Sequence, residues 1–305
     1  MPDRIGHPSR QGATPAARGA RTRRRRQLRV SAAAVSAALV CAVGAASAAD
    51  AGAGCKGTVY LTLDTGNMSQ AQFVADILRR HEVKATFFLA NERTDRGDFA
   101  LDDEWSGYWR ARAAEGHAFG SHTYDHVYLR EARTAGRAAA RAGAGDPAAR
   151  DSAGALPVFL ARPQFGTNAG RTLTWDGAAL CSELRRVDAR LRELAGRGLD
   201  PLWRAPGGRA PAAAMQAASG CGFRHVHWAP AGFLGDELPS ETHPNERLLE
   251  QALARVRDGD VLMAHLGIWS RREPFAPMLD PLIAGLKRRG LCFATLGAPA
   301  VRGRP

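Results

Sequence analysis

The sequence predicts an α/β fold, a (β/α) barrel of about seven parallel strands, on three observations. Seven short apolar segments alternate with helical stretches after residue 50, and such alternation favours parallel strands joined by helical crossovers. Seven units in about 250 residues fit a barrel better than an open dinucleotide-binding sheet. No Gly-x-Gly-x-x-Gly motif follows the first strand, and the sequence has no phosphate-binding loop motif.

The strands are predicted from short runs of β-branched and apolar residues that end at a polar residue or a glycine. The first runs from Val59 to Asp64 and leads into Gly66. The other six strands are predicted at 83–91, 117–122, 201–204, 223–228, 261–265 and 291–296. Apolar residues at helical spacing predict helices that begin near Ser69 and that cover 105–115, 181–195, the region around Met215, 246–257 and 277–289.

Composition and charge indicate a globular domain rather than a nucleic-acid-binding protein. The 305 residues are 45% hydrophobic and 24% charged, which provides ample material for a core. The net charge of +12 is concentrated at one end, because residues 1–49 hold nine arginines against one aspartate and carry +8. The remaining +4 on residues 50–305 is too small to indicate a nucleic-acid partner.

Residues 1–49 are instead predicted to be a basic N-terminal extension plus a signal peptide. Arginines at 21–29 precede an Ala-rich apolar run at 30–46, and the small residues Ser47, Ala48 and Ala49 follow. The run is shorter and less apolar than a membrane span of about 20 residues. We expect export to the periplasm or the exterior without a stable membrane span after cleavage; an uncleaved anchor is the alternative.

The mature domain, residues 50–305, contains Cys55, Cys181, Cys221 and Cys292, an even number in a compartment that permits disulfides. Cys55 opens the first predicted strand and Cys292 the last, and these strands become neighbours if the sheet closes. The sequence therefore predicts a Cys55–Cys292 disulfide, with four buried thiols as the alternative. The Ala-, Arg- and Gly-rich segment 131–151 is predicted to be a surface insertion or a disordered loop.

Several predicted strands end at chemically capable residues, and strand ends carry the chemistry of such barrels. These residues are Asp64, His122, Arg204, Trp228 and His265. We therefore expect one metal-dependent hydrolytic site with Asp64 at its centre.

Each polar residue also has a purely structural interpretation. His122 and His126 are four residues apart, a spacing that can direct two imidazoles at one cation or can arise by chance on a surface. His265 is either a hydrogen-bonded core histidine or a group that protonates a leaving group. Arg204 either pairs with a surface acid or keeps a catalytic carboxylate ionised.

The order of these motifs resembles the polysaccharide deacetylases, carbohydrate esterase family 4, also called the NodB-homology domain. The matching motifs are Thr62-Leu63-Asp64-Thr65-Gly66, His122-x-x-x-His126, Arg204-x-Pro206-x-Gly208, Trp228 and Leu262-Met263-Ala264-His265. The resemblance spans residues 56–296. It implies a distorted (β/α) barrel and metal-dependent removal of acetyl groups from N-acetyl sugars, and sometimes O-acetyl groups, in chitin-like polymers or peptidoglycan.

The resemblance also implies a role for each matching residue. Asp64 becomes the general base that deprotonates a metal-bound water, Arg204 its tether, and His265 the general acid for the departing amine. His122 and His126 become ligands of one divalent ion, zinc or cobalt. Trp228 and Met263 wall the acetyl pocket, and a backbone N–H within 126–128 helps to stabilise the oxyanion.

The sequence departs from the family at two positions. The family commonly has two consecutive aspartates in its first motif, the second of which binds the metal, and here that position is Thr65. Three consequences are open: Asp64 contacts the metal, water fills the position, or metal affinity is reduced. The acid expected after Trp228 is also missing, and Asp236 or Glu237 can substitute for it.

Three functions are compatible with this pattern. The first is an exported deacetylase whose partner is an acetylated envelope glycan. The second is a catalytically silent carbohydrate-binding relative that keeps groove aromatics such as Trp228, Phe233 and Trp269. The third is a metal amidohydrolase with a small non-sugar amide substrate.

Overall fold

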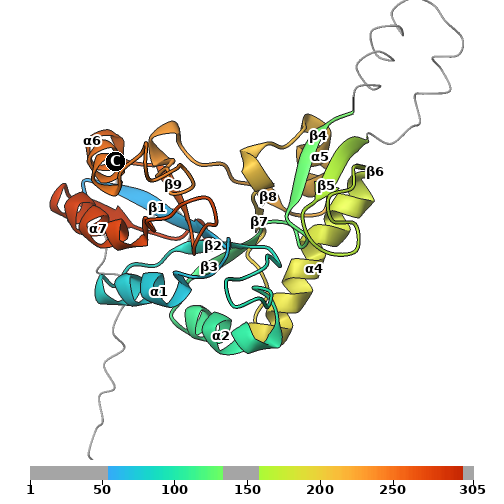
Figure 1. Cartoon of the computed structure of the whole chain (residues 1–305), viewed down its shortest axis with the longest axis horizontal. Helices are drawn as coiled ribbons and strands as arrows, with labels where there is room; N and C mark the ends of the chain where they lie inside the picture. The colour runs from blue at the N-terminus through green and yellow to red at the C-terminus, as the bar shows by residue number, and fades with distance from the viewer. Residues whose placement is uncertain (1–53, 133–157, 298–305) are drawn as a thin grey trace, which may run out of the picture. The chain divides into compact units, whose positions relative to one another are not determined.

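The computed structural model describes residues 54–132 and 158–297 (Figure 1). The predicted basic extension and signal peptide lie outside these residues, as does the predicted 131–151 insertion beyond its first two residues. In the part of the chain that is described, no helix combines the length and apolar character needed to cross a membrane.

All seven predicted strands are present, and every pairing between them is parallel. The sheet has the order β10-β1-β2-β3-β7-β8, and β9 pairs with β1. Their bounds are Gly57–Asp64 (β1), Thr86–Leu89 (β2), Ala118–Ser121 (β3), Leu202–Trp203 (β7), Arg224–His225 (β8), Val261–His265 (β9) and Leu291–Phe293 (β10).

The barrel is distorted because its strands do not form a complete ring. Among the described residues, β8 and β9 do not pair with each other. The chain between them lies along β9 instead: Ala229 N donates to the Val261 carbonyl at 3.0 Å, and Phe233 forms a single parallel bridge with Met263. The predicted fold class is thereby confirmed.

Helices connect and cover the strands, as the alternating pattern predicted. The α-helices are Ala71–Arg80 (α1), Ser106–Ala114 (α2), Gly177–Ala195 (α4), Ala212–Gly220 (α5), Asn245–Arg255 (α6) and Leu279–Arg288 (α7). Short 3₁₀ turns occupy Asp103–Trp105, Pro206–Gly208, Pro230–Gly232 and Ala276–Met278. All six predicted helices are therefore present, with shifts of a few residues at their ends.

Helix α4 shows how the sequence determines one of these elements. Leu180, Leu184, Val187, Leu191 and Leu194 recur at intervals of three or four residues and are all buried. The Asp176 side chain caps the helix by accepting from Ala179 N at 2.9 Å. Gly196 ends it in the left-handed region with φ +72°, where glycine is favoured.

The sequence did not predict a second, antiparallel sheet of three strands. It consists of β4 (Val127–Glu131), β5 (Phe159–Pro163) and β6 (Leu173–Trp175), in the order β4-β5-β6. Buried side chains of this sheet pack with residues of α4 and α5 in a separate core cluster. Strand β4 begins directly after His126, so this sheet adjoins the predicted metal-binding motif.

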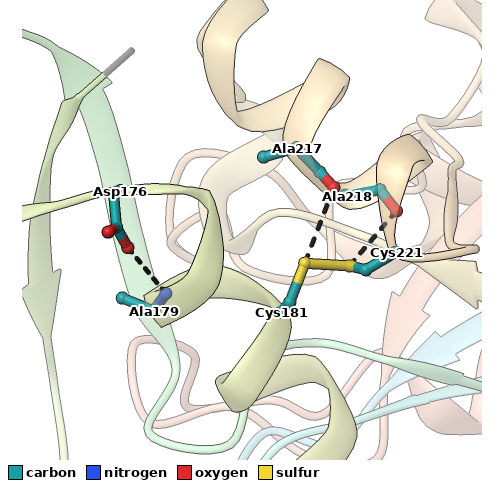
Figure 2. Close-up of a disulfide and its surroundings, with 6 residues drawn as sticks. All are labelled: Asp176, Ala179, Cys181, Ala217, Ala218 and Cys221. Carbon is teal, nitrogen blue, oxygen red and sulfur yellow. Dashed lines mark hydrogen bonds between the residues drawn. A yellow bond between two sulfur atoms is a disulfide. The ribbon is translucent and has the colours of Figure 1, made fainter. Parts of the chain in front are cut away.

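Two disulfides join distant parts of the chain. Cys55 bonds to Cys292, as predicted, and links the segment before β1 to β10 with Cα atoms 5.7 Å apart. Cys181 of α4 bonds to Cys221, the residue that follows α5 (Figure 2). This second disulfide was not predicted, because nothing in the sequence shows that α4 and α5 are neighbours.

Candidate active site

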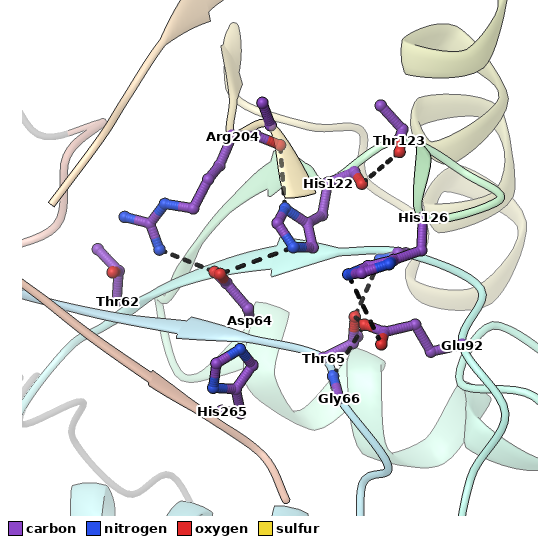
Figure 3. A network of polar contacts seen from close by, with 12 residues as sticks. Thr62, Asp64, Thr65, Gly66, Glu92, His122, Thr123, His126, Arg204 and His265 are labelled. Atoms are coloured by element: carbon purple, nitrogen blue, oxygen red, sulfur yellow. Dashed lines mark hydrogen bonds and ion pairs between the residues drawn. The ribbon is translucent and has the colours of Figure 1, made fainter. Parts of the chain in front are cut away.

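Strand register brings the predicted catalytic residues to one edge of the sheet. Asp64 ends β1 directly opposite His265, which ends β9. His122 and Arg204 follow the paired residues Ser121 and Trp203 of β3 and β7. Since all these strands are parallel, their polar last residues meet at the same edge, where they line or adjoin one cleft (Figure 3).

Asp64 is buried and held by a buried arginine. Its Oδ1 accepts from Arg204 Nη1 at 2.8 Å, and Arg204 Nε donates to the Val226 carbonyl at 3.2 Å. The guanidinium also lies 4.2 Å from the Phe88 ring centroid, a cation–π contact. Burial acts to raise the pKa of Asp64, but Arg204, His122 and His265 outweigh it and lower that pKa. Asp64 is therefore an ionised carboxylate, and the predicted tether is present.

His122 is oriented by a backbone carbonyl. Its Nδ1 lies 2.9 Å from the carbonyl oxygen of Arg204, which can only accept, so Nδ1 carries the proton. The unprotonated Nε2 then faces Asp64 Oδ2 at 3.7 Å. Burial lowers the pKa of His122 to about 4. A neutral imidazole with a free Nε2 and a hydrogen-bonded Nδ1 is the form in which histidine binds metal ions.

His126 reaches the same cleft through a tight loop rather than a helical turn. Thr123 and His126 both have left-handed backbone conformations, with φ +60° and +48°. The Thr123 hydroxyl stabilises the loop by donating to the His122 carbonyl at 2.6 Å and accepting from Val127 N at 2.7 Å. As a result, the His122 and His126 ring centroids are 5.0 Å apart.

Glu92 is a site residue that sequence reasoning missed. It follows β2 by three positions, and its Oε1 accepts from Thr65 Oγ1 at 2.7 Å and from Gly66 N at 2.9 Å. Its other oxygen, Oε2, lies 3.9 Å from His126 Nε2. Burial acts to raise the pKa of Glu92, but His126, His122 and the Thr65 hydrogen bond lower it. The signal was available, because Glu92 is another polar residue beyond a strand end.

His265 has a carboxylate partner, Asp236. The His265 Nδ1 lies 3.1 Å from Asp236 Oδ2, and the His265 backbone N donates to the same oxygen at 2.6 Å. Burial alone lowers the pKa of His265, but Asp236, Asp64 and Glu237 outweigh it and raise that pKa to about 10. His265 is thus an imidazolium at neutral pH, and of the two acids considered after Trp228 it is Asp236 that bonds to His265.

Aromatic and apolar side chains complete the cleft. Trp228 and Met263, the residues predicted to wall an acetyl pocket, both line this cleft, together with Tyr128, Phe165 and the carboxylate-bearing Glu237. Trp228 also lies over the Arg204 guanidinium, 5.5 Å from ring centroid to Cζ. The Val127 amide donates to Thr123 Oγ1, so of the three backbone N–H groups within 126–128 it is not the oxyanion donor; the prediction stays with the amides of His126 and Tyr128.

The donor set of this cleft fits a divalent cation. Within residues 54–132 and 158–297, no three His, Cys, Asp or Glu side chains already form a compact ligand cluster. Two histidine–carboxylate pairs line the cleft: His122 Nε2 lies 3.7 Å from Asp64 Oδ2, and His126 Nε2 lies 3.9 Å from Glu92 Oε2. Two atoms that each bind one ion at about 2.0–2.2 Å are at most about 4.4 Å apart, so either pair can share an ion. Two imidazoles with carboxylates suit zinc and cobalt.

A family model described as polysaccharide deacetylase matches residues 51–226, more than half of the chain. The chain belongs to the polysaccharide deacetylase family. This membership confirms the resemblance and assigns the chain to the carbohydrate deacetylases, hydrolases of carbon–nitrogen bonds other than peptide bonds.

Individual members of the family are similar to this chain in sequence or in fold. A chitooligosaccharide deacetylase from Azorhizobium caulinodans is 24% identical over 250 residues, covering 78% of this chain and 92% of the relative. A family 4 acetyl xylan esterase from Clostridium thermocellum, solved with a cobalt ion, superimposes with a TM-score of 0.55 at 19% identity, over 78% of this chain and 88% of that one. A family 4 pseudoenzyme from Bacillus anthracis superimposes with a TM-score of 0.53 at 16% identity, over 79% and 64%.

Proposed function

We propose that this deacetylase is a metal-dependent enzyme that removes acetyl groups from an N-acetylated, or O-acetylated, glycan of the cell envelope. The observation that carries the proposal is the pairing of an ionised base with a protonated acid on adjacent strands. Asp64 is bonded to Arg204, and His265, opposite it in the β1–β9 register, is bonded to Asp236. The two groups stand in the protonation states that hydrolysis of an amide requires.

Asp64 acts as the general base. Its Oδ1 is occupied by Arg204, and its Oδ2 faces His122 Nε2 at 3.7 Å, so one carboxylate oxygen is free to take a proton from water. Arg204 holds the side chain in this orientation and keeps it charged. Proton abstraction by a positioned carboxylate contributes about 10²–10⁴-fold to a rate.

His265 acts as the general acid. Asp236 accepts from Nδ1, which leaves the protonated Nε2 for the departing nitrogen or oxygen of the sugar. The raised pKa of about 10 ensures that the proton is present at neutral pH. Trp228 and Met263 provide an apolar wall against which the acetyl methyl group can lie.

His122 and His126, together with a carboxylate of the cleft, would hold the metal ion. When bound, the ion would supply Lewis acidity for a carbonyl oxygen and for water. The partner substrate is inferred from the names of the relatives, among which a chitooligosaccharide deacetylase matches over most of its length. The envelope location rests on the export signal predicted from residues 1–49.

The test is acetate release from chitin oligosaccharides, peptidoglycan and acetylated xylan, before and after chelation and after return of zinc or cobalt. We expect activity to disappear with the chelator and to return with either metal. Asp64→Asn lowers kcat by about 10²–10⁴-fold, the contribution of a general base. Full activity of Asp64→Asn, or of chelated protein, would overturn the mechanism.

Thr65 favours a second candidate, the catalytically silent carbohydrate-binding relative. This candidate predicts that acetylated oligosaccharides bind without releasing acetate, with or without added metal. A small-molecule amidohydrolase predicts release from simple acetamides but not from glycans. The same acetate assay, combined with a calorimetric binding measurement, separates all three functions.

A further inference from the structure

Thr65 stands where the family commonly carries a metal-binding aspartate, yet its side chain does not leave an empty position. Its hydroxyl donates to Glu92 Oε1 at 2.7 Å and accepts from Ala90 N at 3.1 Å. Thr65 is completely buried, and its backbone N bonds to the Phe88 carbonyl at 3.2 Å. The hydroxyl therefore connects the end of β1 to the loop after β2, and its one proton is given to a carboxylate.

That carboxylate is hydrogen-bonded through one oxygen, and its other oxygen faces His126. Glu92 Oε1 takes two hydrogen bonds, from Thr65 Oγ1 and from Gly66 N at 2.9 Å. Glu92 Oε2 faces His126 Nε2 at 3.9 Å, and the Glu92 side chain is only 13% exposed (Figure 3). A carboxylate fixed through one oxygen presents the other in a defined direction, as metal-binding carboxylates do.

We propose that Glu92 is the third protein ligand of the metal ion, with His122 and His126, and that Thr65 positions it. The negative charge that the family places at position 65 is supplied here from the loop after the neighbouring strand. This inference rests on the metal-dependent function proposed above, and it adds a fourth consequence of Thr65 to the three considered from the sequence: a carboxylate from another segment takes the place of the missing one.

The arrangement also keeps Asp64 available for catalysis. If Asp64 were the third ligand, the same carboxylate would have to bind the ion, hold Arg204 and act as base. With Glu92 as ligand, the two roles are divided between two carboxylates, each next to one histidine: Asp64 beside His122 and Glu92 beside His126.

The test is zinc affinity of the full-length, metal-stripped protein, measured without substrate by competition with a chromophoric chelator. Loss of a group that only orients a ligand costs about 10–100-fold in metal affinity. We therefore expect Glu92→Gln to weaken zinc binding by more than about 100-fold and Thr65→Val by about 10-fold. The double variant Thr65→Asp with Glu92→Gln returns the carboxylate to the family's position and recovers most of the affinity.

Glu237→Gln is the matched control, because it removes one negative charge from the same cleft without touching either histidine. We expect it to change zinc affinity by less than about threefold. Circular dichroism and thermal unfolding without metal establish that each variant is folded. An unchanged affinity for Glu92→Gln, or equal losses in Glu92→Gln and Glu237→Gln, overturns the proposal.

The wild-type measurement separates this inference from the proposed function. If wild-type protein binds no zinc or cobalt, the metal-dependent function itself fails. If wild-type protein binds the metal and Glu92→Gln binds it equally well while Asp64→Asn does not, only the assignment of Glu92 is wrong and Asp64 is the ligand. The cobalt absorption spectrum provides a second readout, because exchanging a carboxylate for an amide changes the ligand field.

Discussion

The two sides of the active site are built in different ways. On one side, Arg204 and Asp64 form an ion pair whose side chains are 0% and 3% exposed. On the other side, Thr65 and Gly66 hold Glu92 next to His126 by hydrogen bonds at the edge of the cleft. The first side consists of residues at strand ends, whereas the second depends on a carboxylate from the loop after β2. In the metal site proposed above, this loop supplies the negative charge that position 65 does not carry.

The largest difference between the two sides is expected in stability. Arg204→Met leaves the buried Asp64 carboxylate without its partner, and breaking a buried ion pair from one side costs about 3–5 kcal/mol. We expect the free energy of unfolding, measured with urea, to fall by that amount. Glu92→Gln keeps the Thr65 hydrogen bond and leaves no buried charge without a partner, so its cost is about 1 kcal/mol or less.

A double variant shows whether the unpaired charge is the cause. Arg204→Met combined with Asp64→Asn removes both charges and recovers part of the lost stability, because no charge remains buried. Equal free energies of unfolding for Arg204→Met and Glu92→Gln would contradict the prediction that the buried ion pair contributes more to stability than the hydrogen bonds of Glu92.

A second prediction concerns the pKa of His265, which is raised mainly by the nearby carboxylate of Asp236. Asp236→Asn keeps the shape of the partner but removes its charge, so the pKa of His265 falls from about 10 toward its ordinary value near 6.5. NMR titration of the metal-free protein measures this directly. His265→Gln identifies the resonance, and a pKa that stays near 10 in Asp236→Asn would show that Asp236 is not the dominant partner.

The same pKa shift predicts a change in the pH dependence of stability. A histidine whose pKa is raised by folding stabilises the native state fully below about pH 6.5, and this contribution is lost as pH rises through about 10. Wild-type protein is therefore expected to lose stability relative to Asp236→Asn between these two pH values. Urea unfolding of both proteins across this range provides the measurement.

The residues of the parallel sheet were predictable from the sequence because each carries its own signal. A β-branched run that stops at Asp64, and another that stops at His265, specify both a strand and a polar strand end. Because parallel strands have their carboxyl ends at the same edge of the sheet, these polar residues are expected to lie close together. The six helices were likewise indicated by local apolar spacing, as in the buried face of α4.

The features that the sequence did not predict depend on contacts between distant segments. Glu92 follows a strand end, but so do other polar residues of the same loop, and only the contacts with the Thr65 hydroxyl and with His126 distinguish it from them. The Cys181–Cys221 disulfide needs α4 and α5 to be adjacent. The antiparallel β4-β5-β6 sheet needs β4 to pair with a strand that begins at Phe159, across the predicted insertion.

The smallest expected effect is a difference in kcat/KM between substitutions of two aromatic side chains, one from each side of the site. Trp228 lines the cleft beside Arg204, and Tyr128 lines it beside His126 with a ring-centroid distance of 5.3 Å. Trp228 is the larger side chain and is partly buried against Arg204, so it is held in place before a sugar binds, whereas Tyr128 is 39% exposed. Aromatic contacts are worth about 0.5–1.5 kcal/mol beyond the area they bury.

We expect Trp228→Leu to lower kcat/KM for an acetylated oligosaccharide by about 5–10-fold, mostly through KM. Tyr128→Leu is expected to lower it by about threefold or less. A larger effect of Tyr128→Leu would place the main sugar contact on the Glu92 side of the cleft.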